Sequence, residues 1–487
     1  MVVDLDLMDA DCYGKYLAIK SLPIYRFTGR RAWFPDEYAA RIGLDAAVET
    51  NITKVRSGCL FDYQRDISDM AIQRKKFCIF ADCGLGKTLM FLEYLSAANA
   101  DLPADKKILI LSPLMVVRQT LAEAARFYPG MDIAPIAAAQ LPSWLCGEGR
   151  IGITNYESIR PGLDGGRLGC MVLDESSMLK SHYGAWGTEL IRMGRGVPWK
   201  LCCTGTPAPN DRIEYANHAI FMGAHPTVNS FLAKYFVNRG QTAERWEMKP
   251  WAKQAFFNDL SHWAFFLNCP GSYGWKDNAK PLPPINIAIH DVQSTPEQDA
   301  LIRKLFNRLF VTETGGIVKR SMLSQIAKGY YRGKSIPSRK PEFIKELAAN
   351  GDATIIWCVY NREQEGIADA LGCDASIMGA TPYEKKDAYI RAFQAGTIPT
   401  LISKPKILGF GLNLQIASRQ IFSGLQDSYE SFYQAVKRSN RFGSNRSLNV
   451  DIPTLEIERP MVENVLRKAK NIQADTEEQE LLFRKSL

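Results

Sequence analysis

The stretch "KFCIFADCGLGKTLMFLEYL", residues 76–95, decides the fold of this chain. A short apolar run leads into a turn with two glycines, and a helix-forming segment begins at Lys87. A strand, a glycine-rich turn and a helix in this order direct backbone N–H groups and a helix N-terminus at one anion. Gly84 and Gly86 would let the backbone wrap closely around it. Lys87 would reach β- and γ-phosphates, and the Thr88 hydroxyl would bind Mg²⁺. The stretch predicts a nucleotide phosphate site; a turn without a ligand is the alternative.

A phosphate loop needs an acidic partner on a neighbouring strand. The segment "MVLDESS", residues 171–177, is an apolar run that ends in two carboxylates. Asp174 can hold the metal ion, and Glu175 can polarise the attacking water. An acidic pair after a strand also suits a helix start, but downstream of a phosphate loop we favour catalysis.

Short apolar runs alternate with helix-like segments in two zones, which is typical of parallel sheets covered by helices. The first zone has five expected strands, at residues 76–81, 107–113, 151–155, 170–175 and 200–206. The second has three, at residues 354–360, 400–405 and 419–424. Between the zones, the pattern predicts helices and a proline-broken crossing at residues 280–289. The fold class is therefore α/β, with two lobes.

Composition narrows the class of protein. The chain has 487 residues, 46% of them hydrophobic, and a net charge of +8, which permits a polyanionic partner without requiring one. Its eleven cysteines lack a C-x-x-C pair, which favours reduced core thiols in a cytoplasmic protein. The N-terminus has no apolar core of signal-peptide length, and no run of apolar residues is long enough to span a membrane.

The segment "DSYESFYQAVKRSNRFG", residues 427–443, predicts one helix, with a capping-box-like start and a glycine at its end. On such a helix Gln434, Arg438 and Arg441 share a face. Two guanidinium groups on one face suit the stabilisation of charge on a transferring phosphoryl group. A solvated basic face and a contact to a nucleic-acid backbone are equally open alternatives.

Together these motifs resemble superfamily 2 helicases, and within them the Swi/Snf-like translocase branch. The resemblance rests on "ADCGLGKT", "DESS", "LILSPLMVVRQTLAEAARF", "ITNYES", "TGTPAPND", "ISKPKILGFGLNLQ" and "QAVKRSNRFG". They occur in the family's order between about residues 60 and 455. The short chain is also similar to compact bacteriophage helicases. "DESS" departs from the D-E-A-H form, and Ser444 from the usual glutamine.

The resemblance implies ATP and Mg²⁺ as cofactors, and it assigns roles by position. It implies that the nucleotide is bound by Gln64, which would read adenine, and by Gly84, Leu85, Gly86, Lys87, Thr88 and Gln434. Catalysis would use Lys87, Asp174, Glu175, Arg438 and Arg441, and the metal would bind Thr88 and Asp174. Positions whose family counterparts touch the nucleic-acid backbone are Arg118, Thr154, Asn155, Ser403 and Lys404.

The resemblance further implies two RecA-like lobes and DNA, duplex or branched, as the partner. The expected parts are an N-terminal extension (1–55), lobe 1 (56–212), a helical insertion with linker (213–335), lobe 2 (336–460) and a charged C-terminal helix (461–487). The leading function is an ATP-dependent DNA translocase.

Two alternatives remain open. One is a strand-separating DNA or RNA helicase, for which an aromatic-rich part of the insertion could supply a wedge: Trp246, Trp251, Trp263, Phe265 and Phe266. The other is a nucleotide-gated binding module of a larger complex, which would hydrolyse little ATP.

Overall fold

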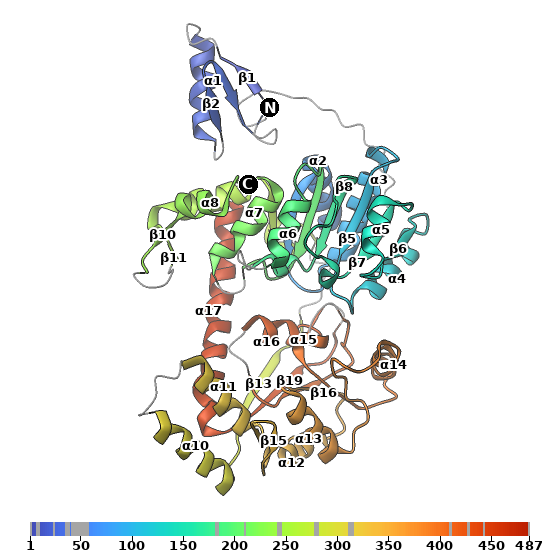
Figure 1. The fold of residues 1–487 in the computed structure, drawn as a ribbon, viewed down its shortest axis with the longest axis vertical. Helices are drawn as coiled ribbons and strands as arrows, with labels where there is room; N and C mark the ends of the chain where they lie inside the picture. Colours follow the sequence, from blue (N-terminus) through green and yellow to red (C-terminus); the bar gives the residue numbers. More distant parts are fainter. Residues whose placement is uncertain are drawn as a thin grey trace. The chain divides into compact units, whose positions relative to one another are not determined.

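The structure is a computed structural model of the chain. It describes residues 2–5, 10–22, 25–34, 39, 58–180, 185–208, 211–240, 246–276, 282–309, 316–408, 412–425, 429–441 and 444–485. The chain forms two compact units (Figure 1). Unit 1 contains residues 1–278 and 476–487, and unit 2 contains residues 279–475.

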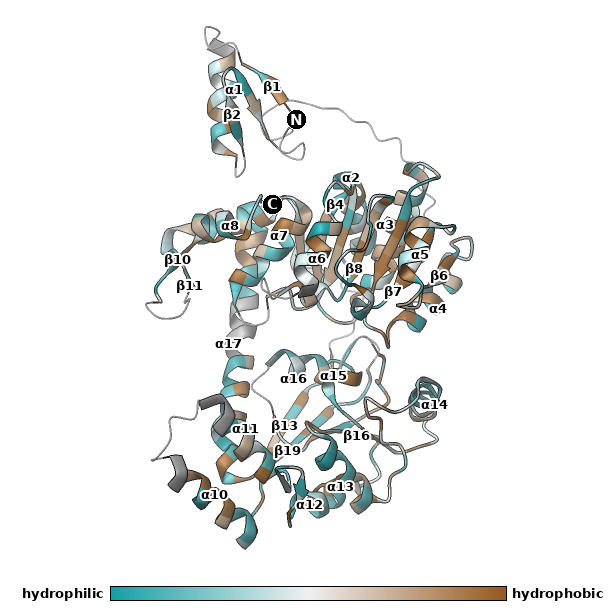
Figure 2. Cartoon of the chain, in the orientation of Figure 1, coloured by the Kyte–Doolittle hydropathy of each residue, from teal (hydrophilic) through white to brown (hydrophobic). Residues whose placement is uncertain are grey.

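The core of unit 1 is a parallel sheet of seven strands. In spatial order they are β12 (Ala264–Leu267), β4 (Lys76–Ala81), β9 (Trp199–Thr204), β8 (Leu168–Asp174), β5 (Lys107–Leu111), β7 (Ile151–Thr154) and β6 (Ile133–Pro135). The central strands are buried along their whole length, as parallel strands covered on both faces should be. Figure 2 shows them mostly in the hydrophobic colour. The five strands expected for the first zone are confirmed.

Helices surround this sheet: α2 (Asp62–Arg74), α3 (Lys87–Asp101), α4 (Val117–Phe127), α5 (Leu141–Cys146), α6 (Ala185–Met193), α7 (Tyr215–Met222), α8 (Val228–Tyr235) and α9 (Lys253–Leu260). Helix α3 packs against β8 and β9, and α7 packs against β4 and β9. A small hairpin, β10 (Phe236–Asn238) with β11 (Trp246–Met248), follows α8.

Strand β12 was not expected, because its four residues lie in the stretch interpreted as a helical insertion. It pairs with β4, and its Phe266 makes an edge-to-face contact with Phe483 near the chain's C-terminus, with ring centroids 5.0 Å apart. Phe483 is fully buried and belongs to helix α17 (Arg459–Arg484). The expectation of a helix at the C-terminus is therefore confirmed, and its last turns complete the core of unit 1.

The five aromatic residues considered as a wedge divide into two groups. Trp263, Phe265 and Phe266 are buried in the core of unit 1. Trp246 is partly buried, whereas the side chain of Trp251 is 79% exposed.

Residues 2–39 contain a small separate module with its own core. Three short antiparallel strands, β1 (Val2–Asp4), β3 (Arg31–Trp33) and β2 (Arg26–Thr28), lie side by side in that order. Helix α1 (Ala10–Ser21) packs on one face of the sheet through Ile19 and Tyr16.

The core of unit 2 is a second parallel sheet. Its strands, in spatial order, are β13 (Ile285–Asp291), β19 (Leu448–Thr454), β18 (Arg419–Phe422), β16 (Thr354–Trp357) and β17 (Thr400–Ser403). The three strands expected for the second zone are confirmed. The crossing expected at residues 280–289 is wrong in its second half, because β13 begins directly after Pro284 and pairs along its whole length with β19.

The helices of unit 2 are α10 (Pro296–Leu309), α11 (Gly316–Ala327), α12 (Lys340–Ala348), α13 (Asn361–Leu371), α14 (Tyr383–Gln394), α15 (Pro405–Leu408), α16 (Tyr429–Val436) and the first part of α17. A hairpin of β14 (Tyr330–Tyr331) and β15 (Lys334–Ser335) joins α11 to α12.

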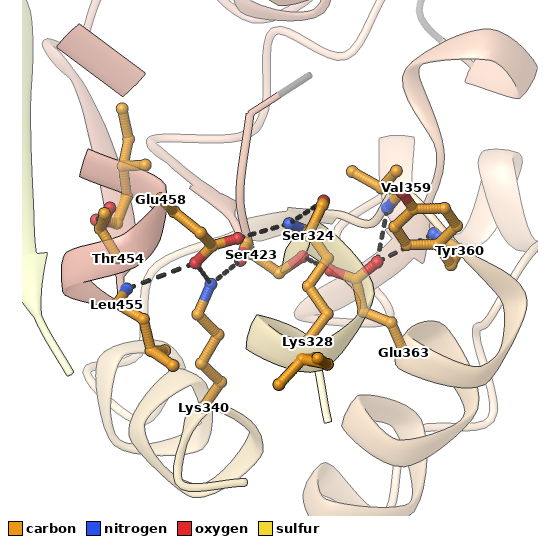
Figure 3. A network of polar contacts seen from close by, with 12 residues as sticks. Ser324, Lys328, Lys340, Val359, Tyr360, Glu363, Ser423, Thr454, Leu455 and Glu458 are labelled. Carbon is orange, nitrogen blue, oxygen red and sulfur yellow. Dashed lines mark hydrogen bonds and ion pairs between the residues drawn. The ribbon is translucent and has the colours of Figure 1, made fainter. Parts of the chain in front are cut away.

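A buried ionic network ties these elements together (Figure 3). The carboxylate of Glu458 accepts hydrogen bonds from the ammonium groups of Lys328, at 2.5 Å, and Lys340. All three residues are almost fully buried. Burial alone would raise the pKa of Glu458, but the two lysines hold it below its ordinary value. Beside them, Glu363 accepts hydrogen bonds from the hydroxyl of Ser423 and from the backbone N–H that begins helix α13.

All eleven cysteines are free thiols. Five are buried, but Cys59 and Cys146 are exposed, so the expectation of core thiols is wrong for these two. Among the described residues, no helix has both the length and the apolar character that crossing a membrane requires.

Candidate nucleotide site in unit 1

One edge of the unit 1 sheet collects the residues of the predicted site. Because the strands are parallel, their carboxyl ends meet at the same edge. Ala81 ends β4, Thr204 ends β9, and Asp174 ends β8. The phosphate loop follows Ala81 directly, so the loop and the acidic pair, which are almost ninety residues apart in sequence, lie two strands apart.

The loop itself depends on glycine. Gly84 and Gly86 adopt φ angles of +89° and +75°, in the left-handed region that other residues avoid. A Cβ atom at position 86 would also lie 2.2 Å from Nε2 of Gln64. That amide donates to the carbonyl of Leu85 at 3.1 Å, and its Oε1 accepts from the N–H of Phe61 at 2.9 Å. Gln64 therefore holds the loop against the start of α2.

Lys87 is the first residue of α3, and its side chain turns back into the loop. Its Nζ donates to the carbonyl oxygens of Ala81, at 2.9 Å, and Asp82, at 3.2 Å. Thr88 follows on the helix and is partly exposed. The ammonium group thus lies within the curl of the loop, held by backbone oxygens that an anionic ligand could replace.

Asp174 is a buried carboxylate, 5% exposed. Ser112 donates to its Oδ2 at 2.8 Å, and Tyr156 donates to its backbone carbonyl at 2.7 Å. Burial and the neighbouring Glu175 raise the pKa of Asp174 to about 7, and Ser112 and Lys87 lower it only in part. A site that holds a carboxylate at such a cost is suited to a cation, because a bound cation favours the charged form.

Glu175 has a strained backbone. Its φ of +52° lies in the left-handed region, which costs a residue with a side chain about 1 kcal/mol or more. The carboxylate is nearly buried and lies 3.5 Å from the hydroxyl of Thr204. That hydroxyl also accepts from the N–H of Thr206 at 3.2 Å, so Glu175 is linked to the segment that follows β9.

His218 was missed by sequence reasoning. It lies on α7, is fully buried, and its Nε2 is 3.0 Å from the hydroxyl of Ser176, the residue after Glu175. Burial lowers the pKa of His218 to about 4, so the ring is neutral near pH 7. One histidine in an apolar helix gave no signal in the sequence. The segment "DESS", residues 174–177, has no histidine of its own, and the imidazole beside it comes from α7.

The predicted residues of unit 2 need one correction. Helix α16 ends at Val436 rather than at Gly443, so Gln434, Arg438 and Arg441 do not share a helix face. The chain continues in tight turns, in which Ser439 N–H bonds to the carbonyl of Val436. The side-chain amide of Gln420 donates to the carbonyl of Ala435 at 3.0 Å, the oxygen that would accept from the N–H of Ser439 if the helix continued.

Beyond the helix, Arg438 is 2% exposed and its Nε donates to the carbonyl of Gln434 at 3.1 Å. Arg441 is partly exposed and donates to the carbonyl of Leu412 at 3.3 Å. Parts of three predicted motifs, at residues 209–210, 409–411 and 442–443, lie outside the described residues.

The five residues predicted to contact nucleic acid differ in exposure. Arg118 is exposed, and Asn155 and Lys404 are partly exposed. Thr154 and Ser403 are buried, with hydroxyl groups that donate inside their own units, to the carbonyls of Ile136 and Ile377. For the buried pair, a direct contact with a ligand would require these bonds to break.

Two family models match this chain. The model described as "SNF2-related domain" matches residues 63–244, and the "Helicase conserved C-terminal domain" matches residues 339–443. Protein p41 of Acyrthosiphon pisum secondary endosymbiont phage 1 is 23% identical over 386 residues, which are 72% of this chain and 82% of p41.

Two solved structures are also similar. The SWI2/SNF2 ATPase core of Sulfolobus solfataricus in complex with dsDNA is 19% identical, with a TM-score of 0.41, covering 87% of this chain and 94% of that one. A second structure, of the SWI2/SNF2 ATPase core domain of the same organism, is 18% identical, with a TM-score of 0.37, covering 81% of this chain and 84% of that one. On the two family models and the two parallel-sheet lobes, this chain belongs to the Swi/Snf-like branch of the superfamily 2 helicases.

Proposed function

We propose that the chain hydrolyses ATP and uses the energy to move along duplex or branched DNA. The observation that carries this proposal is the convergence, at one sheet edge, of a glycine-dependent loop, an inward-turned lysine and a buried carboxylate with a raised pKa. Perturbed titration beside an anion-binding loop is typical of functional sites. Similarity to p41 supports a bacteriophage-type chain that acts in the cytoplasm of a bacterial host.

The residues of unit 1 fit a nucleotide with Mg²⁺. Bound ATP would supply a phosphoryl group whose transfer to water releases energy. Gly84, Leu85 and Gly86 would offer backbone N–H groups to its phosphates, and Gln64 would contact the adenine. Lys87 would exchange its two backbone carbonyls for phosphate oxygens.

The metal ion and the water would be handled by the acidic pair. Asp174 and the Thr88 hydroxyl would hold Mg²⁺, and the ion's charge would keep the Asp174 carboxylate ionised. Glu175 would orient the attacking water and accept its proton. Its strained backbone and its contact with Thr204 would hold the carboxylate in one direction.

Unit 2 would complete the chemistry and link it to DNA. Arg438 and Arg441 would stabilise charge on the transferred group, with Gln434 beside them. Because the chemistry would need residues from both units, each cycle of hydrolysis would move one unit relative to the other. The distance between the DNA contacts of one unit and those of the other would then change. Contacts through phosphates, by Arg118, Thr154, Asn155, Ser403 and Lys404, would be largely independent of base sequence.

The test is ATP hydrolysis by the full chain alone and with duplex, branched and single-stranded DNA and RNA. We expect duplex or branched DNA to stimulate turnover more than RNA. Displacement of a triplex strand then tests movement, beside unwinding of a plain fork at the same salt. Turnover that no nucleic acid stimulates would contradict the proposal.

A strand-separating helicase is the second candidate, because the exposed indole of Trp251 could act as a wedge. Strand separation must disrupt stacking of about 1.4 kcal/mol per base-pair step, which a duplex-tracking motor avoids. Efficient fork unwinding that Trp251→Ala abolishes, without triplex displacement, would favour this candidate.

A further inference from the structure

The N-terminal module has two unlike sheet faces. Along β1, β3 and β2 the register pairs Val3, Ala32 and Phe27 in one row, and this row faces helix α1 in the module's core. Side chains alternate between the faces of a sheet, so the neighbouring residues point the other way. All six of them are exposed: Val2, Asp4, Arg26, Thr28, Arg31 and Trp33. No described residue covers this open face.

Trp33 occupies the middle of the open face. It lies on the central strand, directly between Val2 on β1 and Arg26 on β2, and its side chain is 46% exposed. Adjacent strands are about 4.8 Å apart, so Arg26 and Trp33 occupy neighbouring backbone positions on this face. An exposed tryptophan on a small sheet does little for the module's own core, because Phe34, Ile19 and Leu22 fill it.

The charge around Trp33 points to the class of ligand. Residues 12–34 contain five cations, at positions 15, 20, 26, 30 and 31, whereas the six acidic residues of positions 2–39 lie before and after that stretch, at positions 4, 6, 9, 11, 36 and 37. Three of these cations, Arg26, Arg30 and Arg31, are exposed on or next to the open face. Arg31 pairs with Asp4 at 3.0 Å, but both side chains are over 70% exposed, and such a pair is weak enough for a phosphate to replace.

We infer that this open face binds single-stranded nucleic acid, with a base stacked on Trp33 and phosphates held by Arg26, Arg30 and Arg31. An aromatic ring between cations is the usual platform for unpaired bases, since every base has a face to stack. In a plain duplex the base faces are covered by their neighbours, so the ring selects unpaired strands.

This inference builds on the proposed function and narrows its substrate. A motor that holds an unpaired strand through its N-terminal module would favour DNA in which single and double strands meet. Plain duplex would engage only the two lobes. The preference for branched DNA would then come from residues 2–34, outside the two matched family domains.

The experiment measures binding by the full chain, without nucleotide, to three labelled ligands: an oligothymidylate, an oligouridylate and a blunt DNA hairpin whose strands are joined by a non-nucleotide linker, so that it has no unpaired bases. We expect Trp33→Ala to weaken binding to the single strands about tenfold or more and to the hairpin less than about twofold. Trp33→Phe should retain most of the affinity. Comparing the first two ligands distinguishes DNA from RNA.

Charge variants test the rest of the face. Arg26→Ala should weaken single-strand binding and reduce its salt dependence by about one ion. Asp4→Asn should tighten single-strand binding, because the Asp4 carboxylate would no longer compete with a phosphate for Arg31. Arg195→Ala and Phe306→Ala, at exposed residues outside the module, serve as controls for a lost charge and a lost aromatic ring.

Unchanged single-strand affinity in Trp33→Ala, with a normal circular dichroism spectrum, would overturn the inference. So would an equal loss for hairpin and single strands, which would mean contact with the backbone alone. These results are separable from the proposed function. If DNA failed to stimulate ATP hydrolysis while Trp33→Ala still lost single-strand binding, only the motor proposal would fail.

Discussion

Asp174 in unit 1 and Glu458 in unit 2 are both carboxylates with little exposed surface, but their surroundings differ. Glu458 lies between two buried lysines, which lower its pKa below its ordinary value. Asp174 has one hydroxyl donor and a second carboxylate beside it, and its pKa rises to about 7. One carboxylate is neutralised by the protein, and the other is left for something that the protein binds.

The difference separates structural charge from functional charge. A compensated buried network holds elements in place, and removal of one member exposes the others to an apolar environment. An uncompensated acid lowers stability in its charged form, so its presence indicates a ligand that restores the balance. The two lobes therefore make opposite predictions for the same kind of substitution.

The largest expected effect is on turnover in unit 1. Asp174→Asn, Glu175→Gln and Lys87→Ala should each lower the rate of ATP hydrolysis more than about a thousandfold, or over roughly 4 kcal/mol. Asp174→Asn should unfold at an equal or higher temperature than the parent at pH 8, since it removes a buried charge. Turnover is measured by phosphate release and stability by calorimetry. A destabilised but active Asp174→Asn would break the comparison.

The next effect is on stability in unit 2. Glu458→Gln leaves Lys328 and Lys340 buried without their counter-charge, so we expect a loss of about 3–4 kcal/mol in the free energy of unfolding. Denaturant unfolding measures it. Arg362→Ala breaks an exposed pair with Glu365 and is the matched control, with little expected change. A similar loss of stability in both variants would mean that the buried network contributes no more to the free energy of unfolding than an exposed ion pair does.

The pH dependence should have opposite signs in the two units. The raised pKa of Asp174 gives a contribution that is complete below about pH 4 and lost as pH rises through about 7. The lowered pKa of Glu458 gives one that is present above its unfolded value and lost as pH falls. The stability difference between Asp174→Asn and the parent should therefore grow by about 2–4 kcal/mol between pH 4 and 8. A flat difference would contradict the assigned pKa.

The smallest effect compares two hydroxyl groups. Ser423→Ala removes a donor to Glu363 and should cost about 1–2 kcal/mol of stability, with turnover unaffected. Ser112→Ala removes the donor to Asp174, and should raise the pKa of that carboxyl and shift the pH–rate profile to higher pH. Denaturant unfolding measures the stability of both variants, and phosphate release at a series of pH values gives their rate profiles. A shifted rate profile in Ser423→Ala would remove the distinction.

Sequence patterns predicted the elements whose signal is local. Strand β4, the loop after it and Lys87 were predicted from one stretch of twenty residues. The acidic pair was predicted from a second apolar run, at residues 171–177, which contains both carboxylates. The end of α16 was missed because it depends on Gln420, a residue on another element. His218 and β12 were missed for the same reason: each is defined by a tertiary contact, with Ser176 and with β4.

Helix α17 has a consequence for how the chain folds as it is made. The chain leaves unit 1 after residue 278 and returns to it only at residue 476, where Phe483 enters the core beside β12. During synthesis the core of unit 1 therefore lacks the Phe483 ring that contacts Phe265 and Phe266 until the residues of unit 2 have been translated. Removal of the segment that carries Phe483 would therefore leave the core of unit 1, which is translated first, incomplete.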